Sequence, residues 1–496
     1  MSKLVGQLAR TTTTSLIVLR QLICRTPLLY VNSNGWLRYY CSSHNEDVTD
    51  DDVQVKDFID RQLKLAPMGH QVMVIQPYIK WGTKKDRNTP PAIKLAESKS
   101  LVHTLDDWKI VDEMQVGLTS FRKHSFFGPG NLDLIAQKVR ENKRISAIFV
   151  STNVLKPAQH QTLENQFKVP VYDRYLIVVQ IFRRHAITRE AKLQVALAEV
   201  PYIWSRIRGV QEGYAERLGT EAGQIALGGN LPFDDKKNLL KQYEKKLKKS
   251  IDKLRSHREH LRYGRKNRDL PVVAVVGYTN AGKTSLVKAL TGDSVLVPKN
   301  CLFATLDVTV HGGILPSNMK VLFVDTIGFI SDIPTRLIEP FVATLEDAMF
   351  ADVIVHVRDI SHPNVQVQKE HVENTLKSLS IDQRLLEDVI DVGNKVDLVA
   401  ETTESDNGSS VFVSCTTGVG LDELKSQIEK RIIAVTDRRQ IKIRVRTGQD
   451  EYEWLRAHTA IVAIEPDGEH SVLEVIVTKS DLDVFKSLFI RKNMKS

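Results

Sequence analysis

Short, largely apolar runs recur through the second half of the chain, each followed by a polar or glycine-containing segment. The clearest runs are Val272–Val276, Val321–Val324, Val353–Val357, Val389–Val392 and Val411–Val413. Strands covered on both faces of a parallel sheet are apolar along most of their length, whereas half-exposed strands alternate. The runs therefore predict a doubly wound α/β domain over residues 269–436.

The first half of the chain shows a weaker version of the same pattern. Strands are predicted at Val72–Ile75 and Ile148–Val150, with a helix at Asn131–Asn142. These elements indicate a small α/β domain over residues 59–180.

Two long helical patterns follow, from Ile181 to about Val210 and from Asp235 to about Arg265. In the second, leucine recurs every seven residues, at Leu240, Leu247, Leu254 and Leu261. Leucines at this spacing form a stripe on one face, which is typical of a helix packed against another helix. We therefore expect a helical hairpin over residues 181–268. The five glycines of its loop, residues 211–234, favour a flexible or closely approaching backbone.

The last segment, residues 437–496, alternates apolar and polar residues. Three alternating stretches begin at Ile441, Ala460 and Val472. Alternation is typical of half-buried strands, and helical patterns at 450–458 and 480–490 accompany them. A small C-terminal α+β domain is the result we expect.

Composition narrows the class of protein only slightly. Hydrophobic residues make up 42% of the 496 positions, and no uninterrupted apolar run approaches the ~18 residues that cross a bilayer. We therefore expect no transmembrane segment. The four cysteines form no Cys-x-x-Cys pair, so neither a zinc site nor a disulfide framework is indicated.

The net charge of +9 favours polyanionic partners, and much of it lies in one segment. Residues 236–268 contain 14 lysines and arginines against three acidic residues. Such a run is either a solvated helix face or a surface that binds the phosphate backbone of a nucleic acid. The excess is large for solubility alone, which favours the second interpretation.

Residues 1–45 contain five basic residues and no acidic one, with frequent Ser, Thr and Leu. This composition is typical of a mitochondrial transit peptide, and Arg38–Ser42 resembles a matrix-peptidase cleavage site. A disordered basic tail is the alternative. An acidic linker, residues 46–58, follows. The N-terminal segment therefore predicts a protein of the mitochondrial matrix.

A phosphate-binding loop is predicted directly after the first strand of the doubly wound domain. Residues Gly277–Thr284 read Gly-Tyr-Thr-Asn-Ala-Gly-Lys-Thr and join a strand to a helix, which is the context this motif requires. Its glycines let backbone N–H groups curl around phosphates. Lys283 is expected to reach the β- and γ-phosphates, and the Thr284 hydroxyl to ligate Mg²⁺.

Two further segments are predicted to surround the γ-phosphate. Asp325–Gly328 has the Asp-x-x-Gly form, in which the carboxylate holds the outer shell of Mg²⁺ and the Gly328 N–H contacts the γ-phosphate. Thr305, within Phe303–Asp307, is predicted to close over the metal as its second protein ligand.

Base specificity is predicted from Asn394-Lys395-Val396-Asp397. A carboxylate accepts hydrogen bonds from the guanine N1–H and N2–H₂ groups together, and adenine lacks this pair of donors. The motif thus favours GTP and disfavours an ATP-dependent RNA enzyme. Ser414–Thr416 follow the last strand, where a backbone N–H is placed to meet guanine O6.

The predicted GTP-binding residues are Gly277, Tyr278, Thr279, Asn280, Ala281, Gly282, Lys283, Thr284, Phe303, Ala304, Thr305, Leu306, Asp307, Asp325, Thr326, Ile327, Gly328, Asn394, Lys395, Val396, Asp397, Ser414, Cys415 and Thr416. The residues predicted to act in catalysis are Asn280, Lys283, Thr305 and Gly328.

Two residues bear on how water is activated. Phe329 stands where many small GTPases carry a water-orienting glutamine, and a phenyl ring cannot hydrogen-bond water. Asn280 is a candidate ligand for a K⁺ ion beside the phosphates. The alternative is that its side chain only hydrogen-bonds the loop backbone.

Taken together, these motifs resemble those of the HflX family of translational GTPases. The resemblance includes residues 277–285, 303–307 and 325–330, and in the N-terminal half Leu155–Gln159, Leu163-Glu164, Asp173-Arg174, Ile181-Phe182 and Lys192–Val195. With the predicted transit peptide, the chain is similar to the mitochondrial branch of the family. One segment departs: bacterial members carry Gly-Pro-Gly-Glu-Thr-Gln where this chain has Leu227–Phe233.

The resemblance implies a GTPase that binds GTP, GDP and Mg²⁺ and associates with the large ribosomal subunit and its rRNA. It implies a role in ribosome recycling by subunit splitting, in large-subunit assembly, or in both, and a monomer is expected. An alternative of another class is an RNA-binding assembly scaffold that keeps GTP as a structural ligand with little turnover.

Overall fold

The structure is a computed structural model that describes residues 29–31, 37–39, 58–61, 63, 64, 66, 69–83, 85–123, 125–218, 233–267, 270–331, 350–378, 381–399 and 410–490. The chain divides into two compact units, residues 1–53 and 54–496. In the first, β1 (Leu29–Val31) and β2 (Leu37–Tyr39) form an antiparallel pair. The predicted transit peptide and acidic linker otherwise lie almost wholly outside the described residues.

The second unit begins with a four-stranded parallel sheet in the order β4-β3-β5-β6. Its strands are β3 (Gln71–Ile79), β4 (Lys109–Leu118), β5 (Ala147–Val150) and β6 (Val171–Asp173). Its helices are α3 (Pro91–His103), α4 (Pro129–Glu141), α5 (Pro157–Phe167) and α6 (Arg174–His185). The two predicted strands and the predicted helix are confirmed. The sequence pattern missed β4, because much of this edge strand is polar and partly exposed.

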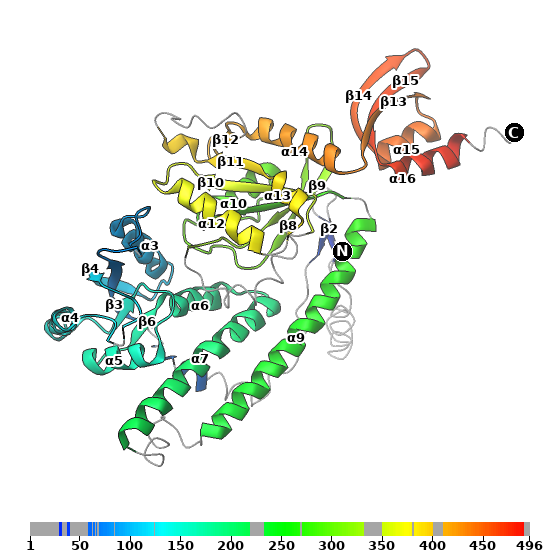
Figure 1. The fold of residues 1–496 in the computed structure, drawn as a ribbon. Helices are drawn as coiled ribbons and strands as arrows, with labels where there is room; N and C mark the ends of the chain where they lie inside the picture. The colour runs from blue at the N-terminus through cyan, green and yellow to red at the C-terminus, as the bar shows by residue number, and fades with distance from the viewer. Residues whose placement is uncertain are drawn as a thin grey trace, which may run out of the picture. The chain divides into compact units, whose positions relative to one another are not determined.

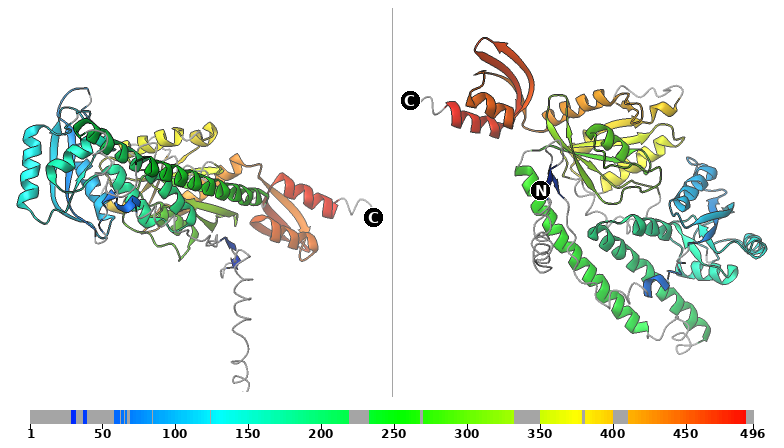
Figure 2. Two further views of the ribbon diagram at one scale, coloured as in Figure 1. Left: turned by 90° about the horizontal axis from the view of Figure 1, so that it is seen from below. Right: turned by 180° about the vertical axis from the view of Figure 1, so that it is seen from behind.

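Two long helices follow, α7 (Arg189–Leu218) and α9 (Phe233–Asn267), which lie side by side (Figures 1 and 2). The single helix predicted from Ile181 is wrong, because α6 ends at His185 and α7 begins at Arg189, after a break of three residues. The first part of the predicted loop is also helical, since α7 runs to Leu218, and residues 219–232 lie outside the described part. In α9, Leu240 and Leu247 are buried, as the leucine stripe predicts.

The second unit also contains a six-stranded sheet in the order β12-β11-β10-β7-β9-β8. Its strands are β7 (Val272–Gly277), β8 (Thr309–Ile314), β9 (Lys320–Asp325), β10 (Val353–Asp359), β11 (Ile390–Asn394) and β12 (Val411–Val413). Five of these are parallel and match the five predicted strands. The antiparallel edge strand β8 was not predicted, because it is partly exposed and contains two glycines.

Helices cover both faces of this sheet, which makes it doubly wound as predicted. They are α10 (Lys283–Thr291), α12 (Val365–Ser378), α13 (Gln383–Glu387) and α14 (Leu421–Val435). Alternate residues of β7 supply the two cores: Val273 and Val275 pack with residues of α10 and α14, whereas Ala274 and Val276 pack with residues of α12. The carboxyl ends of the five parallel strands therefore meet at one edge, where ligands of such sheets bind.

The chain ends in a three-stranded antiparallel sheet in the order β13-β15-β14. Its elements are β13 (Arg439–Arg446), α15 (Asp450–His458), β14 (Ala460–Asp467), β15 (His470–Val477) and α16 (Lys479–Phe485), with a π-helical turn at Lys486–Ile490. Leu455, Leu473, Val475 and Phe485 form a small core between sheet and helices. The predicted strands and helices of this segment are confirmed. No helix in the described part of the chain is long and apolar enough to span a membrane.

Candidate nucleotide-binding site

A pocket of about 410 Å³ opens at the carboxyl edge of the six-stranded sheet. Its lining residues are Thr279, Asn280, Gly282, Lys283, Thr284, Ser285, Pro298, Lys299, Asn300, Cys301, Phe303, Ala304, Thr305, Gly328, Asn394, Lys395, Asp397, Leu398, Cys415 and Thr416. The topology explains the convergence, because the loops after β7, β9, β11 and β12 all leave the sheet at this edge.

The loop after β7 turns sharply into α10 at a glycine that no other residue replaces easily. Gly282 has φ of +95°, in the left-handed region. A Cβ at this position would lie 2.2 Å from the Asn394 amide nitrogen. That amide donates to the Ala281 carbonyl oxygen at 2.9 Å, so the phosphate-binding loop and the base-binding motif are in direct contact.

Lys283 is buried at the first turn of α10. Its Nζ donates to the carbonyl oxygens of Tyr278, at 2.9 Å, and Gly277, at 3.3 Å. Burial lowers the pKa of this ammonium group to about 8, although the Asp325 carboxylate acts in the opposite direction. A Cβ on Gly328 would lie 3.1 Å from this Nζ, so the Asp-x-x-Gly turn closes directly over the lysine.

The three residues predicted to hold Mg²⁺ lie together. The Thr284 hydroxyl is 2.8 Å from the Thr305 hydroxyl, and it donates to Asp325 Oδ2 at 2.7 Å. Thr305 Oγ1 also reaches Asp325 Oδ2, at 3.2 Å. Burial raises the pKa of the Asp325 carboxyl, whereas the Thr284 hydrogen bond and the Lys283 charge lower it.

Two polar atoms beside this cluster lack hydrogen-bond partners among the described residues. They are Asp325 Oδ1 and Thr279 Oγ1, both buried. Leaving such atoms unpaired costs roughly 1–3 kcal/mol each. A group of oxygen atoms with unused lone pairs matches the preference of Mg²⁺ for oxygen ligands. The residues present therefore fit this ion.

The other end of the pocket holds the predicted base-recognition residues. Asp397 Oδ1 accepts a hydrogen bond from the Ser414 hydroxyl at 2.6 Å, which orients the carboxylate. The Cys415 thiol lies 3.2 Å from Asn394 Oδ1, and Lys395 Nζ pairs with Asp359 at 2.6 Å. Burial raises the pKa of Cys415 to about 12, so the thiol is protonated at neutral pH.

Ten predicted residues do not line the pocket: Gly277, Tyr278, Ala281, Leu306, Asp307, Asp325, Thr326, Ile327, Val396 and Ser414. Several of them pack or hydrogen-bond beneath the residues that line the pocket. The Thr326 hydroxyl donates to the Val275 carbonyl at 2.8 Å, and Leu306 and Ile327 belong to the hydrophobic core. Asp307 instead accepts hydrogen bonds from the start of α7.

Six lining residues were not predicted: Ser285, Pro298, Lys299, Asn300, Cys301 and Leu398. Four of them form a segment just before Phe303. The Asn280 amide donates to Asn300 Oδ1 at 2.9 Å. Lys299 and Asn300 lie a few residues before Thr305, and this closeness in sequence is the one feature that could have predicted them as lining residues. They belong to no recognised motif.

Phe329 is buried in the hydrophobic core and does not line the pocket. Its backbone joins the phosphate-binding loop, because its N–H donates to Gly277 O at 3.1 Å and its carbonyl accepts from Thr279 N at 2.6 Å. Phe329 therefore supports the phosphate-binding loop through its backbone, and its side chain cannot hydrogen-bond a water molecule in the pocket.

Comparison with known proteins decides the family. The chain is 35% identical over 315 residues to the GTPase HflX of Caldanaerobacter subterraneus subsp. tengcongensis, covering 64% of this chain and 72% of that protein. This chain belongs to the HflX family of GTPases. Its pocket is thus the site of a GTPase, and the doubly wound sheet is its P-loop domain.

Within the HflX family, the chain is also similar to GTP-binding protein 6 of vertebrates. It is 39% identical over 448 residues to the Homo sapiens protein, covering 90% of this chain and 86% of that one. The Xenopus laevis protein is 37% identical over 444 residues, with coverage of 89% and 84%.

Three family models match this HflX chain in succession. The GTP-binding GTPase N-terminal model matches residues 92–183, and the GTP-binding GTPase middle region matches 185–265. The model described as 50S ribosome-binding GTPase matches residues 272–395. The resemblance stated from the motifs is therefore confirmed at the level of the family.

Proposed function

We propose that this GTPase associates with the large ribosomal subunit of mitochondria through rRNA, and that it acts in ribosome recycling by subunit splitting, in large-subunit assembly, or in both. The observation that carries the proposal is the exposed cationic face of α9. Family membership and the match to a model described as 50S ribosome-binding GTPase support it.

Helix α9 has a buried side and an exposed side. Leu240 and Leu247 are buried, and so is Lys236 one turn before Leu240, whereas six lysines further along the helix are exposed. These lysines are Lys241, Lys245, Lys246, Lys248, Lys249 and Lys253. Lys248 pairs with Glu244 at 2.6 Å. Such a dense row of cations is suited to neutralising successive phosphates, and binding of this kind releases counterions.

Reversing Lys245, Lys246, Lys248 and Lys249 to glutamate is expected to weaken binding to large ribosomal subunits and to flatten its salt dependence. Each lost phosphate contact lowers the slope of log affinity against log salt concentration by about one. The measurement is cosedimentation with purified large subunits over a series of salt concentrations. GTP binding should survive, because none of the four lysines lines the pocket.

A matched control reverses four exposed cations on the N-terminal α/β part instead. Suitable residues are Arg122, Lys123, Lys143 and Arg144. This variant carries the same change in net charge. If both variants bind subunits equally well, or if the α9 variant matches wild type at every salt concentration, α9 is only a solvated face.

For the nucleotide, we assign roles to the residues that the pocket brings together. Lys283 holds the β- and γ-phosphates, Gly328 contacts the γ-phosphate through its N–H, and Asp397 reads guanine. The hydroxyls of Thr284 and Thr305 would hold Mg²⁺, with Asp325 in the outer shell. When bound, the ion supplies positive charge to the phosphate oxygens.

Because Phe329 cannot orient water, catalysis needs another source of positioning, and a monovalent cation beside the phosphates would supply the charge that an arginine finger supplies elsewhere. Asn280 is the candidate ligand for K⁺, since its amide nitrogen donates to Asn300 and leaves its carbonyl oxygen for a cation. The wild-type protein is then expected to hydrolyse GTP at least about tenfold faster in K⁺ than in Na⁺ at equal ionic strength. This is a modest effect beside the 10³–10⁵ that an arginine finger supplies.

Asn280→Ala should erase the difference between the two salts and leave GDP affinity nearly unchanged. Equal rates in both salts for the wild-type protein would end the K⁺ hypothesis. In that case a group supplied by the ribosome would remain as the source of catalysis.

The mitochondrial location rests on the composition of residues 1–45. An Arabidopsis thaliana relative, 33% identical over 313 residues, is named as chloroplastic, which is consistent with organellar members of the family. Import of the full chain into isolated mitochondria, with shortening of the product, is the direct test.

The function is tested most directly by a pulldown of the tagged protein from mitochondria with a non-hydrolysable GTP analogue, followed by RNA sequencing. Enrichment of large-subunit rRNA over small-subunit rRNA is expected, and the α9 charge-reversal variant should lose it. Turnover with and without large subunits separates the enzyme from the scaffold alternative. Stimulated hydrolysis supports a switch, whereas tight binding without hydrolysis supports a scaffold.

A further inference from the structure

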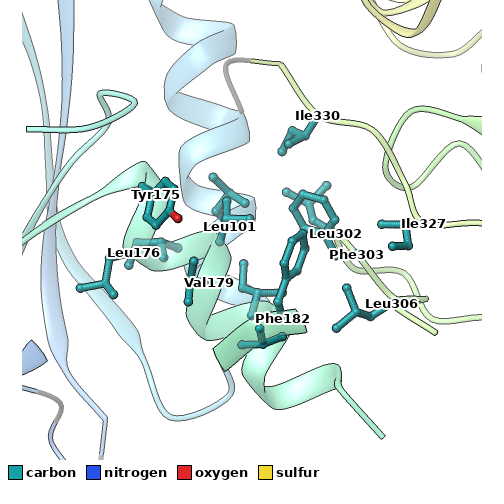
Figure 3. Packing of buried hydrophobic residues seen from close by; sticks show 14 of the residues in the cluster. Leu101, Tyr175, Leu176, Val179, Phe182, Leu302, Phe303, Leu306, Ile327 and Ile330 are labelled. Carbon is teal, nitrogen blue, oxygen red and sulfur yellow. The ribbon is translucent and has the colours of Figure 1, made fainter. Parts of the chain in front are cut away.

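Segment 302–307 carries Thr305, which lines the pocket, and its apolar residues pack against helix α6. The ring of Phe182, near the end of α6, meets the ring of Phe303 edge-on with centroids 4.8 Å apart. Figure 3 shows Phe182 between Val179 and Leu306, with Leu302 and Ile327 nearby. Phe303 is only 1% exposed, so this contact is part of the core.

Polar contacts fix the two ends of the segment. At one end, His185 Nδ1 lies 2.7 Å from the Phe303 carbonyl oxygen. Burial lowers the pKa of His185, so the ring is neutral at pH 7 and donates from Nδ1. The Phe303 backbone has φ of +53°, a conformation that a non-glycine residue adopts only when its surroundings enforce it.

At the other end, the Asp307 carboxylate binds the start of α7. Its Oδ2 accepts from the N–H groups of Ile187, at 3.0 Å, and Thr188, at 3.3 Å. The Thr188 hydroxyl donates to Asp307 Oδ1 and accepts from the Ala191 N–H at 3.1 Å. A carboxylate at a helix N-terminus is stabilised by the unpaired N–H groups and the helix dipole.

We infer that the α6–α7 junction positions Thr305, and that His185 and Thr188 are positioning residues for the GTP-bound arrangement. Thr305 lies midway between the two anchored residues, Phe303 and Asp307, and its hydroxyl is held near Thr284 and Asp325. A segment fixed at both ends loses little conformational entropy when Thr305 engages the metal and γ-phosphate.

The helical hairpin α7–α9 is linked to the Thr305 segment through the same contact. The same Asp307 carboxylate fixes the Thr305 segment and holds Thr188, whose hydroxyl caps α7 by accepting from the Ala191 N–H, and α7 packs along α9. Because coupling between two sites is reciprocal, whatever displaces the first turn of α7 also displaces Thr305.

The test measures nucleotide affinity in the full chain with Thr188→Ala. Thr305 is expected to engage Mg²⁺ only when the γ-phosphate is present. A GTP analogue should therefore bind about tenfold more weakly to the variant in Mg²⁺, whereas GDP affinity stays within about twofold. In the nucleotide-free protein, amide hydrogen exchange should accelerate over residues 302–307 and stay unchanged in β7. Thr188→Ser should restore the affinity for the GTP analogue and the exchange rate, because it keeps the hydroxyl.

His185→Ala should also weaken binding of the GTP analogue and accelerate exchange over residues 302–307. His185→Asn, which retains a donor, should recover part of the loss.

A control separates positioning from a general weakening of α7. Lys192→Gly lowers helix stability by about 1 kcal/mol at an exposed site in the same turn region without touching segment 302–307. It should leave both affinities unchanged. Equal loss of GTP-analogue and GDP affinity in Thr188→Ala, unchanged exchange over 302–307, or the same phenotype in Lys192→Gly would overturn the inference. None of these readouts depends on ribosome binding.

Discussion

Replacing Lys283 by alanine is expected to abolish measurable GTP hydrolysis. The Lys283 ammonium group is buried at the first turn of α10 and is held by the Tyr278 and Gly277 carbonyls, so its position beside the proposed phosphate site is fixed before a nucleotide binds. Charge developing on the β- and γ-oxygens in the transition state would lose its partner. Removing one such preorganised donor typically costs 10²–10³ in rate, and here the lost group is also a full charge.

Single-turnover hydrolysis with saturating GTP and Mg²⁺ is the measurement, because it separates the chemical step from nucleotide binding. Lys288→Ala is a matched control: it removes a lysine from the same helix at a position that does not line the pocket. Hydrolysis at the wild-type rate in Lys283→Ala would remove this residue from the site.

Asp397→Asn is expected to convert the preference of the site from guanine to xanthine. The Asp397 carboxylate lines the pocket, and its Oδ1 accepts a hydrogen bond from the Ser414 hydroxyl at 2.6 Å. Hydrogen bonds between a charged group and guanine donors are worth roughly 1.5–3 kcal/mol each, so GTP affinity should fall by at least about tenfold. An amide can donate to the exocyclic carbonyl of xanthine, so xanthosine triphosphate should gain affinity.

Competition of both nucleotides against a fluorescent GDP measures the switch. Asp422→Asn, an exposed carboxylate at the start of α14, controls for the change in charge. Unchanged GTP affinity in Asp397→Asn would refute the assignment of this carboxylate to the base, even if the chain remained a GTPase.

The elements of the P-loop domain were predictable because their cause is local. A strand buried on both faces needs consecutive apolar residues, and β7 and β10 have them. A tight turn that wraps phosphates needs glycine at a left-handed position, and Gly282 occupies one. The order of motifs at strand ends then places Lys283, Asp325 and Asn394 at one edge, since parallel strands bring their carboxyl ends together.

Contacts between segments far apart in sequence decided where the helix from Ile181 breaks and which predicted residues lie outside the pocket. The pattern from Ile181 is compatible with one helix, and the break at 186–188 is stabilised by Asp307, more than one hundred residues away. The same contact holds Asp307 outside the pocket lining, although the sequence motif predicted it to bind GTP. Tyr278 is likewise buried, with its hydroxyl bound to Ser331 at 2.5 Å.

Local patterns therefore located most strands and helices along this chain, because apolar positions repeat with a fixed period, and short motifs at strand ends located the residues predicted to bind phosphate. Which of those side chains face the pocket was decided by packing between segments far apart in sequence. Lys299 and Asn300 enter the lining, and Asp307 leaves it, because of neighbours that only the folded chain brings near. No periodicity encodes such neighbours, since the free energy of each contact depends on the residues that meet it.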